Sequence, residues 1–332
     1  MAIDLLGIAP NVVSRDLSGY VTYIYGAGGT GKTTLASQMD RALLIAFERG
    51  YLAIPGIRAM DVDSWGKFKQ IVRELKKPEV QAAYKSICID TIDIACDLCE
   101  KYICTREGVE KLGDIAWGGG FKMMKKEFEE TFRSISQMNY ALFFISHSKD
   151  KVIKRDDGTE FNQVIPSLAP SYNEIIRNMS DIQGYAHQTR IENGTPEVML
   201  TLRSADGYVE SKSRFKMIDP EIPFTYEALS KALHDAIDRE AQATDNKFVK
   251  DAPAEKVKLP TYDFAALRAE FDDLVRQIRA DSGDDFKTVW APKIVAITDN
   301  VLGKGKKVND MTENQAELLD VIVNDLKAAM AE

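Results

Sequence analysis

Eight residues near the start of the chain constrain its fold more than any other stretch. Residues 26–33, GAGGTGKT, match the pattern G-x-x-x-x-G-K-[ST]. A β-branched and aromatic run precedes the motif at residues 21–25, and a helical pattern follows it at residues 32–39. In this setting glycines let backbone amides wrap around phosphate groups, and the helix adds its positive dipole end. The motif therefore predicts a triphosphate-binding loop (P-loop). The flanking strand and helix argue against a glycine-rich turn with a chance lysine.

The loop itself supplies most of the residues expected to contact a nucleotide. Lys32 is expected to reach the β- and γ-phosphates, and Thr33 to hold Mg²⁺. The predicted nucleotide-binding residues are Gly26, Ala27, Gly28, Gly29, Thr30, Gly31, Lys32, Thr33 and Thr34. GTPases normally carry an Asn/Thr-Lys-x-Asp guanine reader, and HSKD at residues 147–150 lacks that spacing, so ATP is the predicted nucleotide.

Two acids follow the next apolar runs. Asp90 ends the run SICID, where a second Mg²⁺ ligand is expected. Glu48 ends the run RALLIAFE. Because ligands bind at the carboxyl ends of strands in open α/β sheets, Glu48 should face the same crevice as Asp90. We predict that Glu48 activates the attacking water. The alternatives are a strand-end cap for Asp90 and an acid on a surface turn for Glu48.

The residue after Asp90 bears on the class of ATPase. Proteins of the AAA+ type typically carry their catalytic acid directly after this aspartate, whereas Thr91 follows Asp90 here. The catalytic acid is instead predicted on a separate strand, at Glu48. This placement favours a class other than AAA+.

Apolar runs that alternate with helical patterns indicate the fold class. The runs are residues 21–25, 41–48, 86–90 and 141–146, and the helical patterns are residues 65–75, 92–103 and 121–138. This alternation indicates an α/β fold whose mostly parallel sheet is covered on both faces. After residue 180 apolar and polar residues alternate around Asn193-Gly194, which predicts two or three antiparallel strands that extend the sheet edge.

Composition divides the chain into three parts. Residues 1–240 are predicted to form the α/β core, closed by a helix at residues 226–239. Residues 241–260 are charged, rich in alanine and poor in large apolar side chains, so a linker is predicted. Residues 261–332 carry three amphipathic helical patterns, which predict a small C-terminal helical bundle.

Charge and composition argue against several functional classes. The 332 residues carry a net charge of -8, which argues against coating of nucleic acid by the whole surface. No stretch approaches the eighteen or so apolar residues of a membrane span, and the N-terminus lacks the features of a signal peptide. A cytoplasmic location without a membrane partner is therefore expected. Four cysteines in a chain of this length favour buried thiols over a disulfide framework or a zinc site.

Together these motifs resemble the RecA/KaiC-type ATPase core. The resemblance rests on the phosphate-binding loop, on Glu48 after the next strand, on the Asp90-Thr91 pair, and on the run ALFFISHSK. That run places Ser146 and His147 where RecA-like proteins carry polar residues that sense the γ-phosphate. The alternative for His147 is a buried structural histidine.

More narrowly, GKTTLASQMDRALLIAFERG and ICIDTID resemble phage-encoded, core-only RecA-like ATPases that serve single-strand annealing and recombination. The resemblance covers roughly residues 15–235. It implies binding of ATP, Mg²⁺ and single-stranded DNA, and assembly into rings or filaments in a bacterial host cell. Residues 148–166 would correspond to the first DNA-binding loop, with DNA contacts from Lys149, Lys151, Lys154 and Arg155. A solvated hairpin is the alternative for this segment.

The same resemblance suggests a catalytic role for Lys212 and Arg214 in YVESKSRF. In RecA-like assemblies a comparable basic pair reaches the γ-phosphate of the neighbouring subunit, as an arginine finger does. Alternation along a strand would put both side chains on one face. Any exposed strand face could show the same pattern.

The C-terminal helices lie outside this resemblance and leave a second function open. The chain could be a nucleotide-gated adaptor whose helical part, residues 261–332, docks a single-strand-binding protein or a replication enzyme. A motor or helicase loader with a related core is a third possibility, for which the sequence offers no separate element.

Overall fold

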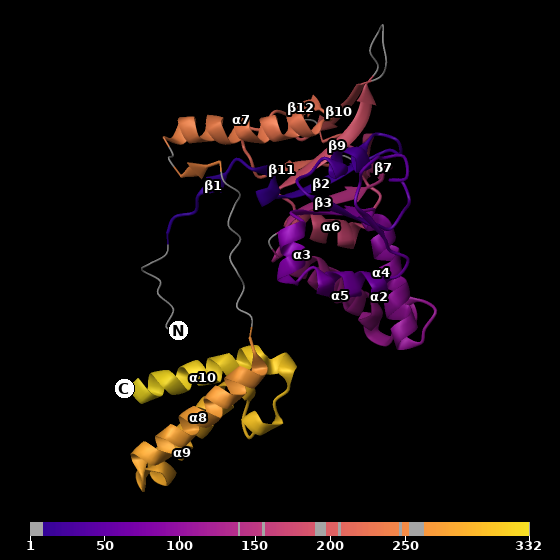
Figure 1. Cartoon of the computed structure of the whole chain (residues 1–332). Coiled ribbons are helices and arrows are strands. Elements are labelled where there is room, and N and C mark those ends of the chain that lie inside the picture. The colour runs from indigo at the N-terminus through magenta and orange to yellow at the C-terminus, as the bar shows by residue number, and fades with distance from the viewer. Residues whose placement is uncertain are drawn as a thin grey trace. The chain divides into compact units, whose positions relative to one another are not determined.

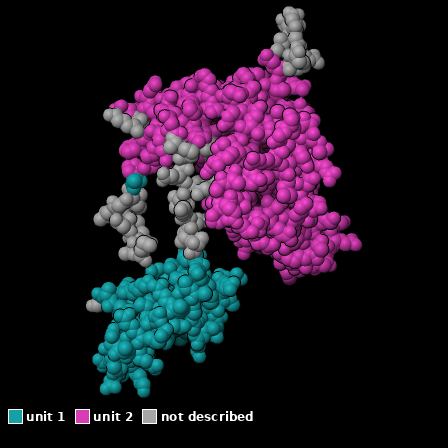
Figure 2. Space-filling model, in the orientation of Figure 1, with its two compact units in different colours: residues 1–9, 259–332 teal, residues 10–258 magenta. Residues whose placement is uncertain are grey.

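The computed structural model describes residues 9–138, 140–154, 157–189, 197–204, 207–245, 248–251 and 262–331. The chain divides into two compact units, shown in magenta and teal in Figure 2. The larger unit is Pro10–Lys258, and Leu259–Glu332 belong to the smaller one.

A nine-stranded sheet forms the centre of the larger unit (Figure 1). Its strands are β2 (Val21–Gly26), β3 (Ala42–Ala46), β4 (Ala59–Asp61), β5 (Ser86–Asp90), β6 (Ala141–Ser146), β9 (Ile182–Thr189), β10 (Glu197–Thr201), β11 (Lys212–Ser213) and β12 (Glu221–Pro223). The strand order is β12-β10-β9-β2-β6-β5-β3-β4, and β11 also pairs with β9. Strand β6 therefore separates the P-loop strand β2 from β5, which ends in Asp90.

Strands β2, β3, β4, β5, β6 and β9 run parallel, and β10, β11 and β12 pair in the antiparallel sense. This confirms the mostly parallel α/β sheet predicted from the apolar runs. One detail differs, because the first strand after residue 180, β9, pairs parallel with β2 before it pairs antiparallel with β10. Asn193 and Gly194, where a hairpin turn is predicted, lie outside the described residues.

Helices cover both faces of the sheet. They are α1 (Lys32–Ser37), α2 (Trp65–Glu74), α3 (Pro78–Ala83), α4 (Ile92–Glu107), α5 (Gly119–Ser136), α6 (Pro170–Met179) and α7 (Tyr226–Thr244). Helices α1 and α7 pack on one face, against Ile24 and its neighbours. Helices α2, α4, α5 and α6 bury a second cluster on the other face.

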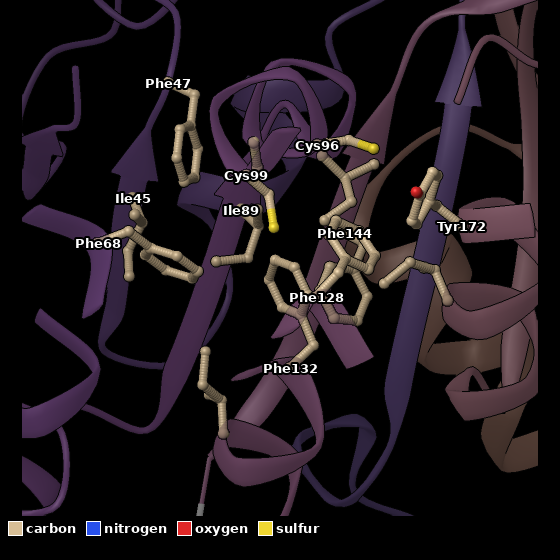
Figure 3. Close-up of a cluster of buried hydrophobic side chains, with 14 of the residues drawn as sticks. Ile45, Phe47, Phe68, Ile89, Cys96, Cys99, Phe128, Phe132, Phe144 and Tyr172 are labelled. Atoms are coloured by element: carbon tan, nitrogen blue, oxygen red, sulfur yellow. The ribbon is translucent and has the colours of Figure 1, made fainter. Parts of the chain in front are cut away.

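The second cluster is rich in aromatic side chains (Figure 3). The rings of Phe128 and Phe132 on α5 lie 4.8 Å apart edge to face, and Phe132 packs against Phe144 of β6 at 5.5 Å. Cys96 and Cys99 lie in the same cluster, so their thiols act as small apolar groups. This packing anchors α5 and β6, whose ends border the sites described below.

A separate two-stranded hairpin follows β6. Strand β7 (Ser148–Lys154) pairs antiparallel with β8 (Glu160–Pro166). The segment predicted as a DNA-binding loop is therefore an ordered hairpin over most of its length.

The end of the larger unit differs from the predicted boundary at residue 240. Helix α7 continues to Thr244, because Ala241, Gln242 and Ala243 are good helix formers. Beyond it, β13 (Val249–Lys250) pairs parallel with β1 (Val13–Ser14). Part of the predicted linker 241–260 is thus regular structure in the larger unit, and residues 252–260 lie outside the described residues.

The smaller unit contains α8 (Phe264–Ser282), α9 (Ala291–Leu302) and α10 (Ala316–Ala331), with a π-helical turn at Phe286–Trp290. Its own apolar core is built around Phe271, Ile278, Leu319 and Ile322. A capping box at Thr312 and Gln315 opens the short 3-10 helix Glu313–Gln315, which leads directly into α10. Among the described helices of both units, none is long and apolar enough to cross a membrane.

Candidate nucleotide site

The P-loop leaves a strand that is buried along its whole length. A Cβ at Gly26 would lie 2.3 Å from the carbonyl oxygen of Ala186, so only glycine permits this approach of β2 to β9. Gly29 and Gly31 have φ angles of 78° and 86°, in the left-handed region that favours glycine. Three of the motif's glycines are therefore required by the backbone itself.

Lys32 folds back into the loop that carries it. Its Nζ donates hydrogen bonds to the carbonyl oxygens of Gly26 at 2.8 Å and Ala27 at 2.7 Å. Burial lowers the pKa of Lys32, and the carboxylates of Asp90 and Glu48 oppose that effect. The ammonium group is thus held at the centre of the loop between carbonyl dipoles and two acids.

Thr33 and Asp90 form the second contact of the site. The Thr33 hydroxyl donates a hydrogen bond of 2.7 Å to Oδ2 of Asp90. Asp90 is buried, and desolvation raises the pKa of its carboxyl group to about 6, although the Thr33 hydrogen bond lowers it. A hydroxyl and a carboxylate in contact are oxygen ligands of the kind Mg²⁺ prefers, so this pair fits the predicted metal site.

Glu48 lies beside this pair, as its position after β3 predicted. Its backbone amide donates to the carbonyl of Asp90 at 3.2 Å. A Cβ built on Gly50 would lie 3.8 Å from Oε1 of Glu48 and 3.9 Å from Oγ1 of Thr33. The carboxylate and the hydroxyl therefore border the same space.

His147, which directly follows β6, adds an imidazole to this group of side chains. Its Nε2 lies 3.4 Å from Oε2 of Glu48, and its side chain is 39% exposed. This exposure disagrees with the alternative of a fully buried structural histidine. The contact links Glu48, the predicted general base, to the residue directly before β7.

Asp93 was not predicted and proves to organise this corner. It accepts hydrogen bonds from the hydroxyls of Ser146 at 3.0 Å and Ser167 at 2.5 Å, and from the amide of His147 at 3.3 Å. The amide of Ser167 also donates to the carbonyl of His147 at 2.8 Å. One carboxylate on α4 thus holds both ends of the β7–β8 hairpin. The available signal was an acid one residue after the helix start, beside a Ser-His strand end.

Tyr25 provides a second connection between the P-loop strand and the hairpin. Its hydroxyl lies 3.0 Å from the carbonyl oxygen of Val164 on β8 and 2.8 Å from that of Glu210. Burial raises the pKa of this phenol, so it stays a neutral hydrogen-bond donor.

Lys212 and Arg214 do not join these residues. The ammonium group of Lys212 donates to the carbonyl oxygen of Arg177 at 2.6 Å, and Arg214 pairs with Asp181 at 3.0 Å. Asp181 also accepts from the amide of Val21, where β2 begins. The pair therefore lies at the amino end of β2, whereas the P-loop follows its carboxyl end. Both side chains do point the same way, to carbonyls at the end of α6.

The predicted DNA-binding residues lie on β7, except Arg155, which lies outside the described residues. Lys149, Lys151 and Lys154 are exposed. Lys149 donates to the carbonyl of Ser167 at 2.8 Å, and Lys154 pairs with Glu160 at 3.0 Å. Two of these three cations thus already have partners within the hairpin.

Sheet order and site together define a P-loop ATPase domain of the α/β type. The chain belongs to a family described as an AAA domain, which matches residues 18–215. The absence of an acid directly after Asp90 therefore did not exclude an AAA-domain family. The chain is also 30% identical to the SPbeta prophage-derived uncharacterized protein YorG of Bacillus subtilis (strain 168), in an alignment 352 positions long that covers the full length of both chains.

Proposed function

We propose that this site binds ATP with Mg²⁺ and hydrolyses it. Water attacks the γ-phosphorus, Glu48 takes the proton, and the bond to the β-phosphate oxygen breaks to give ADP and inorganic phosphate. Lys32 and the loop amides hold the phosphates, while Thr33 and Asp90 hold the metal ion, which would neutralise charge on the phosphates. The observation that carries this proposal is the position of Glu48 between the Thr33–Asp90 pair and His147.

Glu48→Gln tests the role of this carboxylate. The variant should bind ATP as the wild type does, because the P-loop is untouched, and should hydrolyse it about 100-fold or more slowly. Radiolabelled phosphate release measures turnover, and a fluorescent ATP analogue measures binding. Wild-type turnover in the variant would contradict the assignment.

The proposed use of this ATP is to control binding of single-stranded DNA in phage-type recombination or annealing, in a bacterial host cell. Three features support a RecA-like core: the acid after β3, the antiparallel strands beyond β9, and a hairpin that starts directly after His147. The prophage origin of the relative supports the phage setting. Because Asp93 and Tyr25 tie the hairpin to the nucleotide site, ATP binding would change how Lys149 and Lys151 meet the strand.

We also propose assembly into rings or filaments, for which the place of Lys212 and Arg214 is the supporting observation. In their own subunit they lie far along the sheet from the P-loop, so we propose that they act on the nucleotide of a neighbouring subunit.

Filter binding with single- and double-stranded DNA, with and without ATP, tests the DNA proposal. We expect binding of the single strand, strengthened by ATP, and weaker binding of Lys149→Gln/Lys151→Gln. Failure of the wild type to bind single strands at low salt would overturn it.

An adaptor function is the second candidate, because α8, α9 and α10 bury an apolar core of their own. Removal of residues 252–332 distinguishes the two. Intact annealing with lost recruitment of a single-strand-binding protein or replication enzyme would assign docking to the helices, and lost annealing would contradict it.

A further inference from the structure

An aromatic side chain is exposed to solvent in the turn just before α5. Trp117 is 98% exposed, the largest exposed fraction among the described large hydrophobic side chains. Its φ and ψ of 59° and 26° place a bulky residue in the left-handed region, which costs free energy. Phe121, four residues later, is 57% exposed. Neither the fold nor the nucleotide site accounts for these two rings.

Several lysines lie near the two rings in the sequence. Residues 111–126 contain four lysines and one acid, Asp114, in a chain of net charge -8. Asp114 accepts a hydrogen bond from the amide of Lys111 and so closes its own turn. Lys122 and Lys125 are exposed and make no hydrogen bond or ion pair to any residue that the structure describes. Helical spacing of three and four residues puts Phe121, Lys122 and Lys125 on one side of α5.

Buried residues of α5 fix the position of this surface on the core. Met124 and Phe128, on the same helix, are completely buried in the aromatic core. A Cβ at Gly120 would lie 2.4 Å from the carbonyl oxygen of Leu112, so the turn before the helix packs closely on its start. Changes to the exposed side chains should therefore leave the fold intact.

We propose that Trp117, Phe121, Lys122 and Lys125 form a stacking surface for single-stranded DNA. Exposed rings offer faces to unpaired bases, and nearby ammonium groups contact the phosphates between them. A duplex hides its base faces, so the surface selects single strands. It lies apart in sequence from the β7–β8 hairpin, where Lys149 and Lys154 are already bonded. The proposal rests on the proposed function and adds a second contact to the same strand.

The test uses the full chain and an oligothymidine strand with ATP present. Trp117→Ala should weaken binding about 5- to 150-fold, whereas Trp117→Phe, which keeps an aromatic face, should stay near wild type. Lys122→Gln/Lys125→Gln should lower the slope of log affinity against log salt by about 1.4. Lys76→Gln, an exposed lysine on another turn, is the control.

Tryptophan fluorescence reports the contact directly. Trp65 is buried and Trp290 lies in the smaller unit, so quenching by the oligonucleotide should come from Trp117 and vanish in Trp117→Phe. Quenching that persists in Trp117→Phe, or wild-type affinity in Trp117→Ala, would overturn the stacking surface alone. Absence of strand binding by the wild type would overturn both this surface and the proposed function.

Discussion

The two ends of the central sheet differ in what they can do within one subunit. At the carboxyl end, Lys32, Thr33, Asp90, Glu48 and His147 gather from four neighbouring segments. At the amino end, Lys212 and Arg214 contact carbonyl oxygens of α6 and the carboxylate of Asp181. The carboxyl end thus carries a set of groups that suits ATP, and the amino end carries cations whose proposed target lies in another subunit.

Lys32→Ala should have the largest effect at the carboxyl end. The substitution removes the cation at the centre of the loop, so ATP turnover should fall to background. A phosphate-release assay measures this, with circular dichroism as the control for folding. Turnover at the wild-type rate would remove the nucleotide site from this end of the sheet.

Arg214→Ala tests the amino end, with an expected loss of about 10³-fold in ATP turnover if it acts as an arginine finger. The Arg214 side chain is 56% exposed in its ion pair with Asp181, which is 15% exposed, so the free energy of unfolding should fall by only about 1 kcal/mol. Mixing Arg214→Ala with Lys32→Ala subunits separates the two explanations. Partial recovery of turnover would show that the neighbouring subunit contributes its arginine. No recovery would show that Arg214 only caps the end of α6.

Asp90→Asn tests the carboxyl end of the sheet through the free energy of unfolding. The pKa of Asp90 is about 6 in the folded protein, above its ordinary value of 3.8, so folding is favoured at low pH and loses that contribution as pH rises from about 4 to 6. The variant, neutral throughout, should be about 3 kcal/mol more stable than wild type at pH 8 without nucleotide or metal. Denaturant titrations at pH 4.5 and 8 measure the difference, and an equal effect at both would refute it.

Asp93→Asn should have the smallest effect of these variants. It should change how single-stranded DNA stimulates ATP turnover, rather than the hydrolysis step itself. It disturbs the hydrogen bonds that hold both ends of the hairpin, while the groups around the phosphates remain. Turnover without DNA should change less than about threefold, and its stimulation by single-stranded DNA should fall roughly 10-fold. Ser167→Ala, which removes one of these hydrogen bonds, should lie between this variant and wild type. Unchanged stimulation in Asp93→Asn would show that Tyr25 or another contact suffices.

Much of the nucleotide site could be predicted because its signals are local. The glycines, Lys32 and Thr33 lie in one motif, and Asp90 and Glu48 end apolar runs whose parallel pairing brings them to one edge. The sequence did not predict the parallel pairing of β9, because its alternation of apolar and polar residues is typical of an antiparallel strand. The full length of α7 was also missed, because its charged last turns resemble a linker. Asp93 was missed because its partners, Ser146 and Ser167, lie more than fifty residues away.

The amino-acid order alone establishes a P-loop, the acids beside it and a parallel α/β sheet, since each depends on short patterns of residue type. Tertiary packing decides which of these groups meet. It joins Glu48 to His147, separates Lys212 and Arg214 from the P-loop, and leaves Trp117 in solvent just before a helix whose inner face is buried. Contacts between residues distant in the chain depend on strand order and side-chain burial, and no local pattern records either.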